Sequence, residues 1–147
     1  MGKFRDFVAG KRIALVGPAS TLEGQRMGAF IDSHDIVVRL NHAWPLPDAY
    51  KEDIGSRTDV IYHNMNFSDQ KMTRKEVVRM HRDGVKWMVS THPASEARFR
   101  HRLRKFRKIN DGLLEFRALP GSLKAKMQRS VRHPNAGIMA IEDLLRF

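Results

Sequence analysis

KRIALVG, residues 11–17, is the stretch that decides the fold class. Its short apolar run stops at a glycine, which is typical of a buried strand that ends in a turn. Four further segments have strand patterns, the last of them weaker than the others: residues 34–40, 58–63, 85–90 and 113–116. Helical patterns lie between and after them, at residues 20–32, 68–82, 94–110, 119–128 and 135–147. This alternation predicts a Rossmann-like α/β fold, a parallel sheet with helices on both faces.

The size and composition of the chain allow one domain with a substantial core. Its 147 residues, 41% of them hydrophobic, suffice for a single domain and not comfortably for two. The sequence holds no cysteine, which excludes a disulfide framework and a thiolate metal site. The net charge of +11 favours anionic partners such as nucleotides, nucleic acid, acidic sugars or a membrane surface.

Neither a membrane span nor a secretion signal is evident in the sequence. No stretch approaches the ~18 consecutive apolar residues that a membrane-spanning helix needs. Residues 1–11 are charged and lack the apolar centre of a secretory signal peptide. We therefore expect a cytoplasmic location and no membrane span.

Small and polar residues follow the first two predicted strands, at the edge where a parallel sheet binds its ligands. Gly17, Pro18, Ala19 and Ser20 follow the first strand, and Asn41 follows the second. Gly17 has no Cβ and lets a ligand approach the backbone, and a helix beginning near Ser20 would point free N–H groups at a phosphate. Asn41 can both donate and accept, as recognition of a base or ribose requires. The alternative that Gly17 and Asn41 only serve tight turns stays open.

Several common ligand motifs are absent. The glycines at 17, 24 and 28 do not have the G-x-G-x-x-G spacing of a dinucleotide site, and no Walker A lysine follows a glycine loop. No Asp-x-Asp pair follows a strand, which argues against a metal ion held on a nucleotide diphosphate. The histidines show no His-x-x-x-His spacing, so a zinc site is not expected. The sequence therefore argues against an NAD-dependent oxidoreductase and predicts no metal site.

Residues 98–108 are strongly basic, with seven Arg or Lys and no acidic residue. Such a segment can form a surface for nucleic acid or an anionic acceptor, or it can be the solvated face of an amphipathic helix. Phe99, Leu103 and Phe106 are spaced as a core-facing stripe. We favour the amphipathic helix, because the stripe explains the segment without any partner.

The last predicted helix, residues 135–147, begins with Asn135, Ala136 and Gly137. Asn135 is a good N-cap residue, and Gly137 keeps the first turn uncrowded. The segment is either an ordinary capped helix or a helix N-terminus that faces a phosphate, with His133 nearby as a donor. The apolar pattern predicts four residues on one side of this helix: Ile138, Ile141, Leu144 and Leu145.

Three blocks of sequence read KRIALVGPAS (11–20), IDSHDIVVRLN (31–41) and DIGSRTD (53–59). In order and spacing they resemble the large sialylmotif of the sialyltransferases, glycosyltransferase family twenty-nine. HPNAGIMAI, residues 133–141, resembles the start of the small sialylmotif of the same family. The resemblance implies a Rossmann-like transferase domain over residues 1–147, incomplete relative to the family.

The resemblance also implies an activity and a set of ligand contacts. The activity is inverting, metal-independent transfer of sialic acid from CMP-sialic acid to a glycan hydroxyl, without a cofactor. On this basis the partners are a nucleotide-sugar donor and a glycan acceptor, and nucleic acid is not expected. The residues implied to contact CMP are Gly17, Pro18, Ala19, Ser20 and Asn41 from one side, and Asn135, Ala136 and Gly137 from the other.

The chain departs from the family pattern at several points. Pro18 stands where the family commonly has asparagine, and the family's linked cysteines and membrane anchor have no counterpart. The histidine motifs that lie downstream of the small sialylmotif also have no counterpart, so no catalytic residue is assigned. His42, His63 and His92 sit at predicted strand ends as candidate substitute bases. The alternative functions are a basic nucleic-acid-binding α/β module and a catalytically inactive CMP-binding fragment, and the oligomeric state stays open.

Overall fold

A computed structural model describes residues 2–18, 20–66 and 72–147. Five parallel strands form one sheet in the order β1-β2-β3-β4-β5. They are β1 (Ile13–Val16), β2 (Ile36–Leu40), β3 (Val60–His63), β4 (Trp87–Ser90) and β5 (Glu115–Ala118). In their register Leu40 pairs with Tyr62, and His63 with Ser90. The carboxyl ends of β2, β3 and β4 therefore meet at one edge of the sheet.

One face of the sheet is covered by the helices that connect the strands. They are α2 (Gly28–Asp32), α3 (Lys51–Ile54), α4 (Arg74–Arg82) and α5 (Ala97–Asn110). Right-handed crossovers between strands in sequential order place all connections on the same side. The predicted core stripe of α5 is confirmed, because Phe99, Leu103 and Phe106 are buried. The first part of the predicted helix 68–82, up to residue 71, lies outside the described residues.

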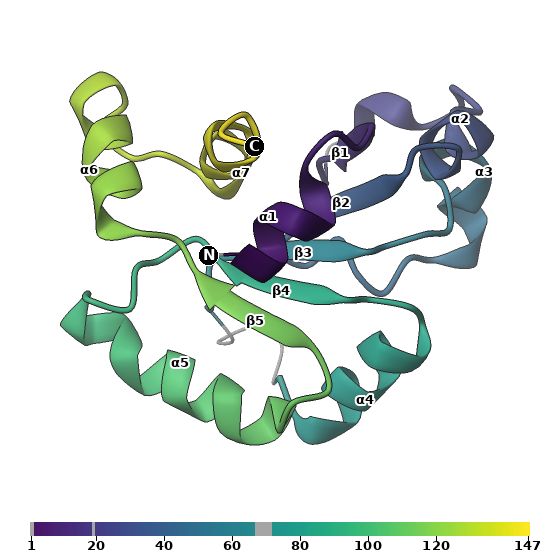
Figure 1. Cartoon of the computed structure of the whole chain (residues 1–147). Helices are drawn as coiled ribbons and strands as arrows, with labels where there is room; N and C mark the ends of the chain where they lie inside the picture. Colours follow the sequence, from purple (N-terminus) through teal and green to yellow (C-terminus); the bar gives the residue numbers. More distant parts are fainter. Residues whose placement is uncertain (1, 19, 67–71) are drawn as a thin grey trace.

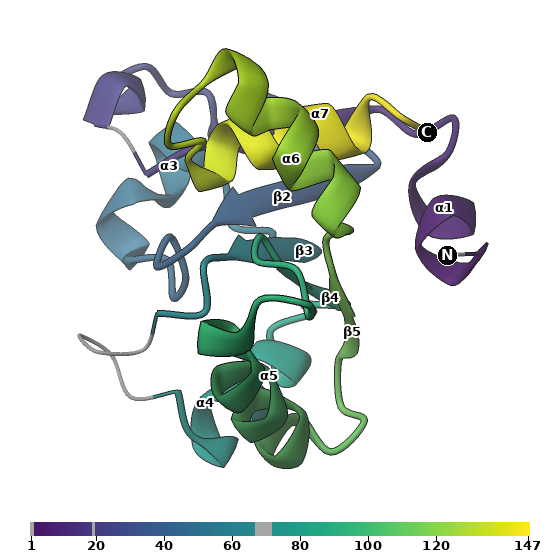
Figure 2. The same ribbon diagram turned by 90° about the vertical axis from the view of Figure 1, so that its left-hand side faces the viewer.

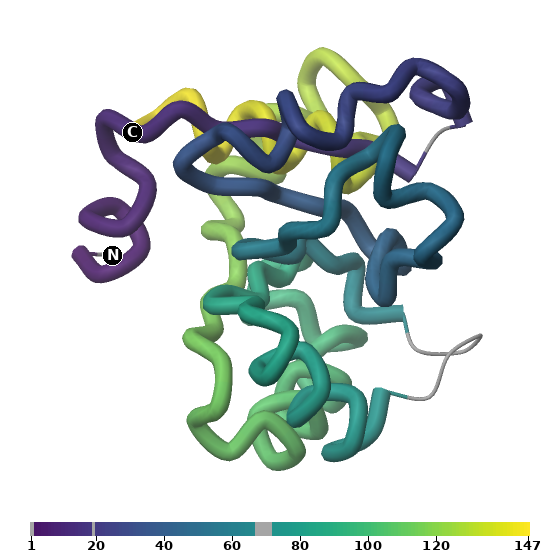
Figure 3. Tube along the Cα trace, turned by 90° about the vertical axis from the view of Figure 1, so that its right-hand side faces the viewer, coloured from purple at the N-terminus to yellow at the C-terminus, as the bar shows by residue number. Residues whose placement is uncertain are grey.

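The opposite face is covered by α1 (Gly2–Val8), α6 (Gly121–Ser130) and α7 (Ala136–Leu144), as Figures 1 and 2 show. Helices on both faces confirm the predicted Rossmann-like architecture. Figure 3 shows the two termini on the same side of the molecule, and the ring centroids of Phe4 and Phe147 lie 5.9 Å apart. The sequence analysis did not predict α1, which buries Phe4 and Val8.

A buried polar group fixes α7 across the sheet. The Tyr62 hydroxyl donates to Asp143 Oδ2 at 2.7 Å, and Arg117 forms an ion pair with the same carboxylate. The Arg117 guanidinium also lies over the Phe4 ring, 4.1 Å from its centroid. A Cβ on Gly137 would lie 3.4 Å from Leu40 Cδ1, so the start of α7 packs closely on the end of β2.

The predicted helix 20–32 is wrong, because the segment is broken. It forms a single 3₁₀ turn, η1 (Ser20–Leu22), and then the short helix α2. Gly24 and Arg26 between them have positive φ angles of 73° and 52°. The Asp53 carboxylate accepts from the N–H groups of both residues at 2.9 Å, so a distant side chain stabilises this break. Residues 42–56, between the second and third strands, contain a 3₁₀ turn, η2 (Asp48–Tyr50), and α3.

Asp32, at the end of α2, anchors the turn that leads into β3. Its carboxylate accepts from the N–H of Ser56 (2.7 Å), the Ser56 hydroxyl (2.8 Å) and the N–H of Arg57 (3.0 Å). Partial burial raises the pKa of Asp32, but these hydrogen bonds outweigh it and hold the pKa below its ordinary value. Gly55 has a φ of 78°, and a Cβ there would lie 2.5 Å from Asp32 Oδ1, so this turn requires glycine.

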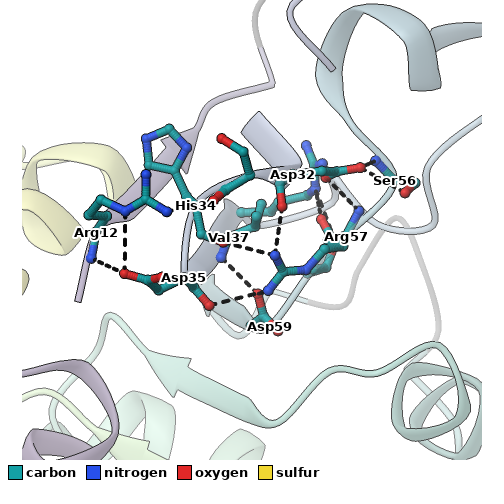
Figure 4. A network of polar contacts seen from close by, with 11 residues as sticks. Arg12, Asp32, His34, Asp35, Val37, Ser56, Arg57 and Asp59 are labelled. Atoms are coloured by element: carbon teal, nitrogen blue, oxygen red, sulfur yellow. Dashed lines mark hydrogen bonds and ion pairs between the residues drawn. The ribbon is translucent and has the colours of Figure 1, made fainter. Parts of the chain in front are cut away.

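Arg57 joins the amino-terminal ends of β2 and β3 (Figure 4). Its Nη1 donates to the carbonyls of Asp32 (2.7 Å) and His34 (2.8 Å). Its Nη2 donates to the carbonyl of Asp35 (3.2 Å) and the carboxylate of Asp59 (3.0 Å). Two of the blocks that resemble the large sialylmotif therefore hold each other in place at this edge.

In the part of the chain that the structure describes, no helix combines the length and the apolar character needed to cross a membrane.

Candidate functional site

Asn41 is fixed across the carboxyl ends of β2 and β3. Its backbone is in the left-handed region, with a φ of 50°, which asparagine tolerates better than most residues. Its N–H donates to the Tyr62 carbonyl at 2.7 Å, and its Oδ1 accepts from the Asn64 N–H at 2.9 Å. The Oδ1 atom is thus held by the protein, and the Nδ2 group remains as a donor.

The start of α7 lies close to Asn41. Asn135 caps this helix as predicted, because its Oδ1 accepts from the Ile138 N–H at 2.9 Å. Gly137 packs against Leu40, the residue that precedes Asn41. The first N–H groups of an α-helix have no acceptor inside the helix and carry a partial positive charge. Asn41 is therefore next to donors that suit an anion.

A cavity of about 280 Å³ opens at this edge of the sheet. It brings together three of the predicted site residues, Asn41, Asn135 and Ala136, and Gly137 is outside its lining. Six further residues complete the wall: Asn64, Thr91, His92, Lys124, Pro134 and Met139. Among these described residues there is no carboxylate, so the cavity offers amides, a hydroxyl, an imidazole and an ammonium group.

The residues that follow β1 line a different cavity, of about 360 Å³. Gly17, Pro18 and Ser20 belong to its wall, whereas Ala19 lies outside the described residues. This segment and Asn41 therefore line separate cavities at the ends of neighbouring strands, and a ligand that contacts both stays a prediction. The predicted phosphate-binding helix at Ser20 is wrong, because only a 3₁₀ turn begins there.

Gly17 has no structural reason to be glycine. Its φ lies outside the left-handed region, and a Cβ there would meet no atom within 4 Å. A tight turn requires glycine when its φ angle is positive, and a close backbone contact requires it when a Cβ would clash. The space beside Gly17 is therefore open.

Arg39 is buried beneath the second cavity, with 1% of its surface exposed, and the sequence analysis did not single it out. Its Nε donates to the Arg57 carbonyl and the Thr58 hydroxyl, and its Nη2 donates to the Ile54 carbonyl at 2.7 Å. Burial lowers its pKa to about 10, so the guanidinium stays charged at neutral pH. Its buried Nη1 has no hydrogen-bond partner among the described residues.

Two of the candidate substitute bases lie together at the end of β2 and β3. The rings of His42 and His63 are perpendicular, with centroids 5.1 Å apart. His63 is buried, and its Nδ1 accepts from the Met65 N–H at 2.8 Å. Burial, with a smaller effect of His42, lowers the pKa of His63 to about 3. His63 is therefore a buried, neutral residue of the turn, and His42 lines the second cavity.

The third candidate, His92, lies in the wall of the first cavity and stacks on Phe99 with ring centroids 3.5 Å apart. Burial and then the charge of Lys124 lower the pKa of His92 to about 4, so it is neutral at pH 7. Lys124 Nζ lies 3.4 Å from His92 Nδ1. Glu96 Oε2 lies 3.8 Å from the same nitrogen. In the tautomer in which Nδ1 accepts from Lys124, Nε2 carries the proton, and His92 offers it as a hydrogen-bond donor.

These features define the class of protein. A parallel α/β sheet has, at its carboxyl edge, a cavity whose walls donate hydrogen bonds from amides, an imidazole, an ammonium group and a helix N-terminus. Such donors suit a phosphate-bearing ligand.

Comparison with known proteins gives the family. The family model described as glycosyltransferase family 29 (sialyltransferase) matches residues 8–141. The chain belongs to glycosyltransferase family 29, as the resemblance of its motifs predicted.

Individual relatives match shorter stretches. A type 2 lactosamine alpha-2,3-sialyltransferase of Rattus norvegicus is 37% identical over 71 residues, which cover 47% of this chain and 20% of the relative. An alpha-N-acetylneuraminide alpha-2,8-sialyltransferase of Xenopus tropicalis is 38% identical over 61 residues, 42% of this chain and 17% of the relative. A beta-1,6-galactosyltransferase of Arabidopsis thaliana is 37% identical over 57 residues, 39% and 14% respectively. The chain thus spans a fifth or less of the length of these relatives.

Proposed function

We propose that this chain binds the CMP part of CMP-sialic acid in the 280 Å³ cavity, as the donor-binding part of a sialyltransferase. One observation carries the proposal. Asn41 ends the block that resembles the large sialylmotif, and Asn135 and Ala136 belong to the block that resembles the small one. The fold brings these distant residues to a single cavity at the edge where parallel sheets bind ligands.

The cavity suits the leaving group of the transfer. The bond between the anomeric carbon and the phosphate oxygen breaks, and its electron pair goes to the oxygen, so the phosphate gains a negative charge. Donors at the start of α7 and on His92 stabilise that charge without a metal ion. The acceptor hydroxyl attacks the anomeric carbon from the opposite side, which inverts its configuration, and a base takes the hydroxyl proton.

The nucleotide and the sugar are separate parts of the proposal. One relative is named a galactosyltransferase, so family membership alone does not fix the donor sugar. The proposal of CMP-sialic acid rests on the two sialylmotif-like blocks and on a cavity that favours an anionic ligand. We propose a glycan hydroxyl as the acceptor and no metal or cofactor.

Binding experiments test the nucleotide first. Isothermal titration with CMP, UMP and AMP in the presence of EDTA is expected to show CMP bound at least about tenfold more tightly than AMP, a difference of about 1.4 kcal/mol. Amide NMR shifts on adding CMP should be largest at Asn41, Asn64 and Ala136. Equal affinity for CMP and AMP, or a requirement for a divalent metal, contradicts the proposal.

A transfer assay tests the chemistry. CMP-sialic acid and a panel of β-galactoside acceptors are incubated with the protein, and the anomeric configuration of the product is read by NMR. Inversion is expected. Retention of configuration contradicts the mechanism. If the protein binds CMP but transfers no sugar, the result supports the alternative of a CMP-binding chain that is not an enzyme by itself.

A further inference from the structure

The structure points to a phosphate-binding residue that neither sialylmotif-like block contains. We infer that Lys124, in the middle of α6, is the cation that binds the donor phosphate. The inference rests on the proposed function of the 280 Å³ cavity and names the side chain that would recognise its anionic group.

Lys124 lies in the wall of that cavity together with Asn41, Asn135 and Ala136. Its side chain is only 14% exposed, so the ammonium group is confined near the cavity rather than free in solvent. Helix α6 lies beside α7, and an ion pair between Lys126 and Glu142 joins the two helices. The packing of α6 therefore brings Lys124 to the same cavity as the start of α7.

Lys124 supplies the charge that the cavity otherwise lacks. Among the described residues of its wall, it is the one side chain that is charged at neutral pH, because His92 is neutral there. A phosphate ester in a site without a metal ion needs a neutralising cation or several strong donors. The start of α7 provides partial charge only, which leaves the full charge to Lys124.

The contacts of Lys124 leave it one hydrogen-bond donor for a ligand. An ammonium group has three N–H bonds. One contact goes to the Glu96 carboxylate, with which Lys124 forms an ion pair, and a second goes to His92 Nδ1 at 3.4 Å. The described residues supply no third nitrogen or oxygen acceptor, and the Phe99 ring centroid lies 5.9 Å from Lys124 Nζ. Lys124 is thus held in place by two protein groups while its remaining N–H is available to a phosphate oxygen.

Glu96 holds Lys124 without fully cancelling its charge. The Glu96 carboxylate also pairs with Arg98, whose Nε lies 3.4 Å from Oε2. Burial raises the pKa of Glu96, but the hydrogen bond and charge of Lys124 outweigh it and lower the pKa. Since one carboxylate is shared by two cations, the three side chains together keep a net positive charge.

Lys124 also sets the role of His92. By donating to Nδ1, it leaves the proton on Nε2 and turns the imidazole into a second donor. Lys124 and His92 therefore act together on the same anion. The phosphate gains negative charge when the sugar leaves, so both contacts strengthen during the transfer.

The experiment compares CMP with cytidine, which lacks the phosphate, in matched variants of α6. Titration of Lys124→Met is expected to show CMP affinity about tenfold to a hundredfold weaker than in the unmodified protein. Its cytidine affinity should stay within about twofold. Arg129→Met is the control, because it removes the same charge from an exposed position of the same helix, away from the cavity wall. It should leave both affinities unchanged, and Lys124→Arg should restore part of the CMP affinity.

Glu96→Gln separates a ligand-binding role from a structural one. If the Lys124–Glu96 pair only holds α6 in place, both Glu96→Gln and Lys124→Met weaken CMP binding. If Lys124 binds phosphate, Glu96→Gln frees more of its charge and strengthens CMP binding about twofold to fivefold. The two models therefore predict opposite signs, and circular dichroism checks that each variant is folded.

These outcomes separate a failure of the proposed function from a failure of the role of Lys124 alone. A protein that binds neither CMP nor cytidine overturns the proposed function itself. CMP affinity that survives in Lys124→Met, or CMP and cytidine affinities that fall equally, overturns only the role of Lys124.

Discussion

The two edges of the sheet carry polar clusters that differ in how fully their hydrogen bonds are satisfied. At the amino-terminal edge, both terminal nitrogens of Arg57 donate to two acceptors each, and Asp32 accepts three hydrogen bonds. At the carboxyl-terminal edge, Asn41 and Lys124 each keep a donor that no described residue uses, beside a cavity. The first cluster is closed and holds the fold, and the second is open and suits a ligand.

This contrast separates two roles within one stretch of sequence. Residues 32–35 and 56–59 lie at the closed edge, whereas Asn41, in the same motif-like region, lies at the open one. Resemblance to a motif therefore does not say which residues bind a substrate. Variants at the two edges should change stability and ligand affinity independently.

Asp32→Ala tests the closed edge and is expected to have the largest effect on stability. It removes a carboxylate that accepts from Ser56 and Arg57, and leaves their N–H groups without an acceptor. We expect the free energy of unfolding to fall by about 2–4 kcal/mol, as measured by urea denaturation. CMP affinity of the folded protein should change less than about twofold.

Asp35→Ala is the matched control for Asp32. Asp35 belongs to the same motif-like block and is exposed. Its carboxylate accepts from the backbone N–H of Arg12 at 2.8 Å and pairs with the Arg12 guanidinium, whose Nε is 3.6 Å away. The free energy of unfolding should fall clearly less in Asp35→Ala than in Asp32→Ala. Equal losses in the two variants contradict the assignment of Asp32 as the anchor of the closed edge.

Stability should also fall as the protein is acidified. The pKa values of His63 and His92 are lowered from 6.5 to about 3 and about 4, so the unfolded chain binds protons that the folded chain does not. The two neutral histidines contribute their full stabilisation above pH 6.5. This stabilisation is lost as the pH falls from 6.5 towards the lowered pKa values of about 4 and about 3. The lowered pKa of Asp32 adds a loss below its ordinary value of 3.8.

Urea denaturation at a series of pH values measures this dependence. The free energy of unfolding should decrease steadily from pH 6.5 towards pH 4, and His92→Gln should reduce the slope over that interval. A flat profile between these pH values shows that the two histidines are not buried in their neutral form.

Asn41→Asp tests the open edge and should change affinity far more than stability. Aspartate tolerates the left-handed backbone and keeps an oxygen that accepts from the Asn64 N–H. It replaces the free amide donor with a negative charge that repels a phosphate. We expect CMP affinity to fall about tenfold to a hundredfold and the free energy of unfolding to change by less than about 1 kcal/mol.

Titration with CMP and cytidine measures the effect of Asn41→Asp. Cytidine carries no phosphate charge, so its affinity should fall less than that of CMP. Unchanged CMP affinity in a folded Asn41→Asp protein means that the ligand does not reach the end of β2.

Much of the fold could be predicted from the sequence because each buried strand is a short apolar run that ends at a turn residue. The helix expected at residues 20–32 could not, because the break at Gly24 depends on Asp53, which is distant in sequence. The inner side of α7 was predicted only in part: Leu144 packs against the core as expected, and Ile138 is partly buried. Ile141 and Leu145 are 49% and 79% exposed, whereas Asp143 is buried, because it pairs with Tyr62 and Arg117. Hydrophobic periodicity does not reveal a buried ion pair.

The candidate site was predictable where local sequence carries the signal. Asn41 after a strand and Asn135 before a helix have recognisable positions, and both line one cavity. Lys124 has no such signal, since it is one of several basic residues on an ordinary amphipathic helix. Its place at the cavity follows from how α6 packs against the sheet, which is a tertiary property.

Gly17→Ala should have the smallest effect on stability. It tests whether the ligand-binding edge of the sheet extends to the end of β1. Neither backbone angle nor packing requires glycine there, so the free energy of unfolding should change by less than about 0.5 kcal/mol. Gly137→Ala is the contrasting control, because its Cβ would lie 3.3 Å from Asn135 Oδ1 and 3.4 Å from Leu40, and should lower stability more. If Gly17 faces the donor, Gly17→Ala weakens CMP-sialic acid binding without a change in urea midpoint. Unchanged binding confines the donor site to the cavity beside Asn41 and leaves the space beside Gly17 without a part in donor recognition.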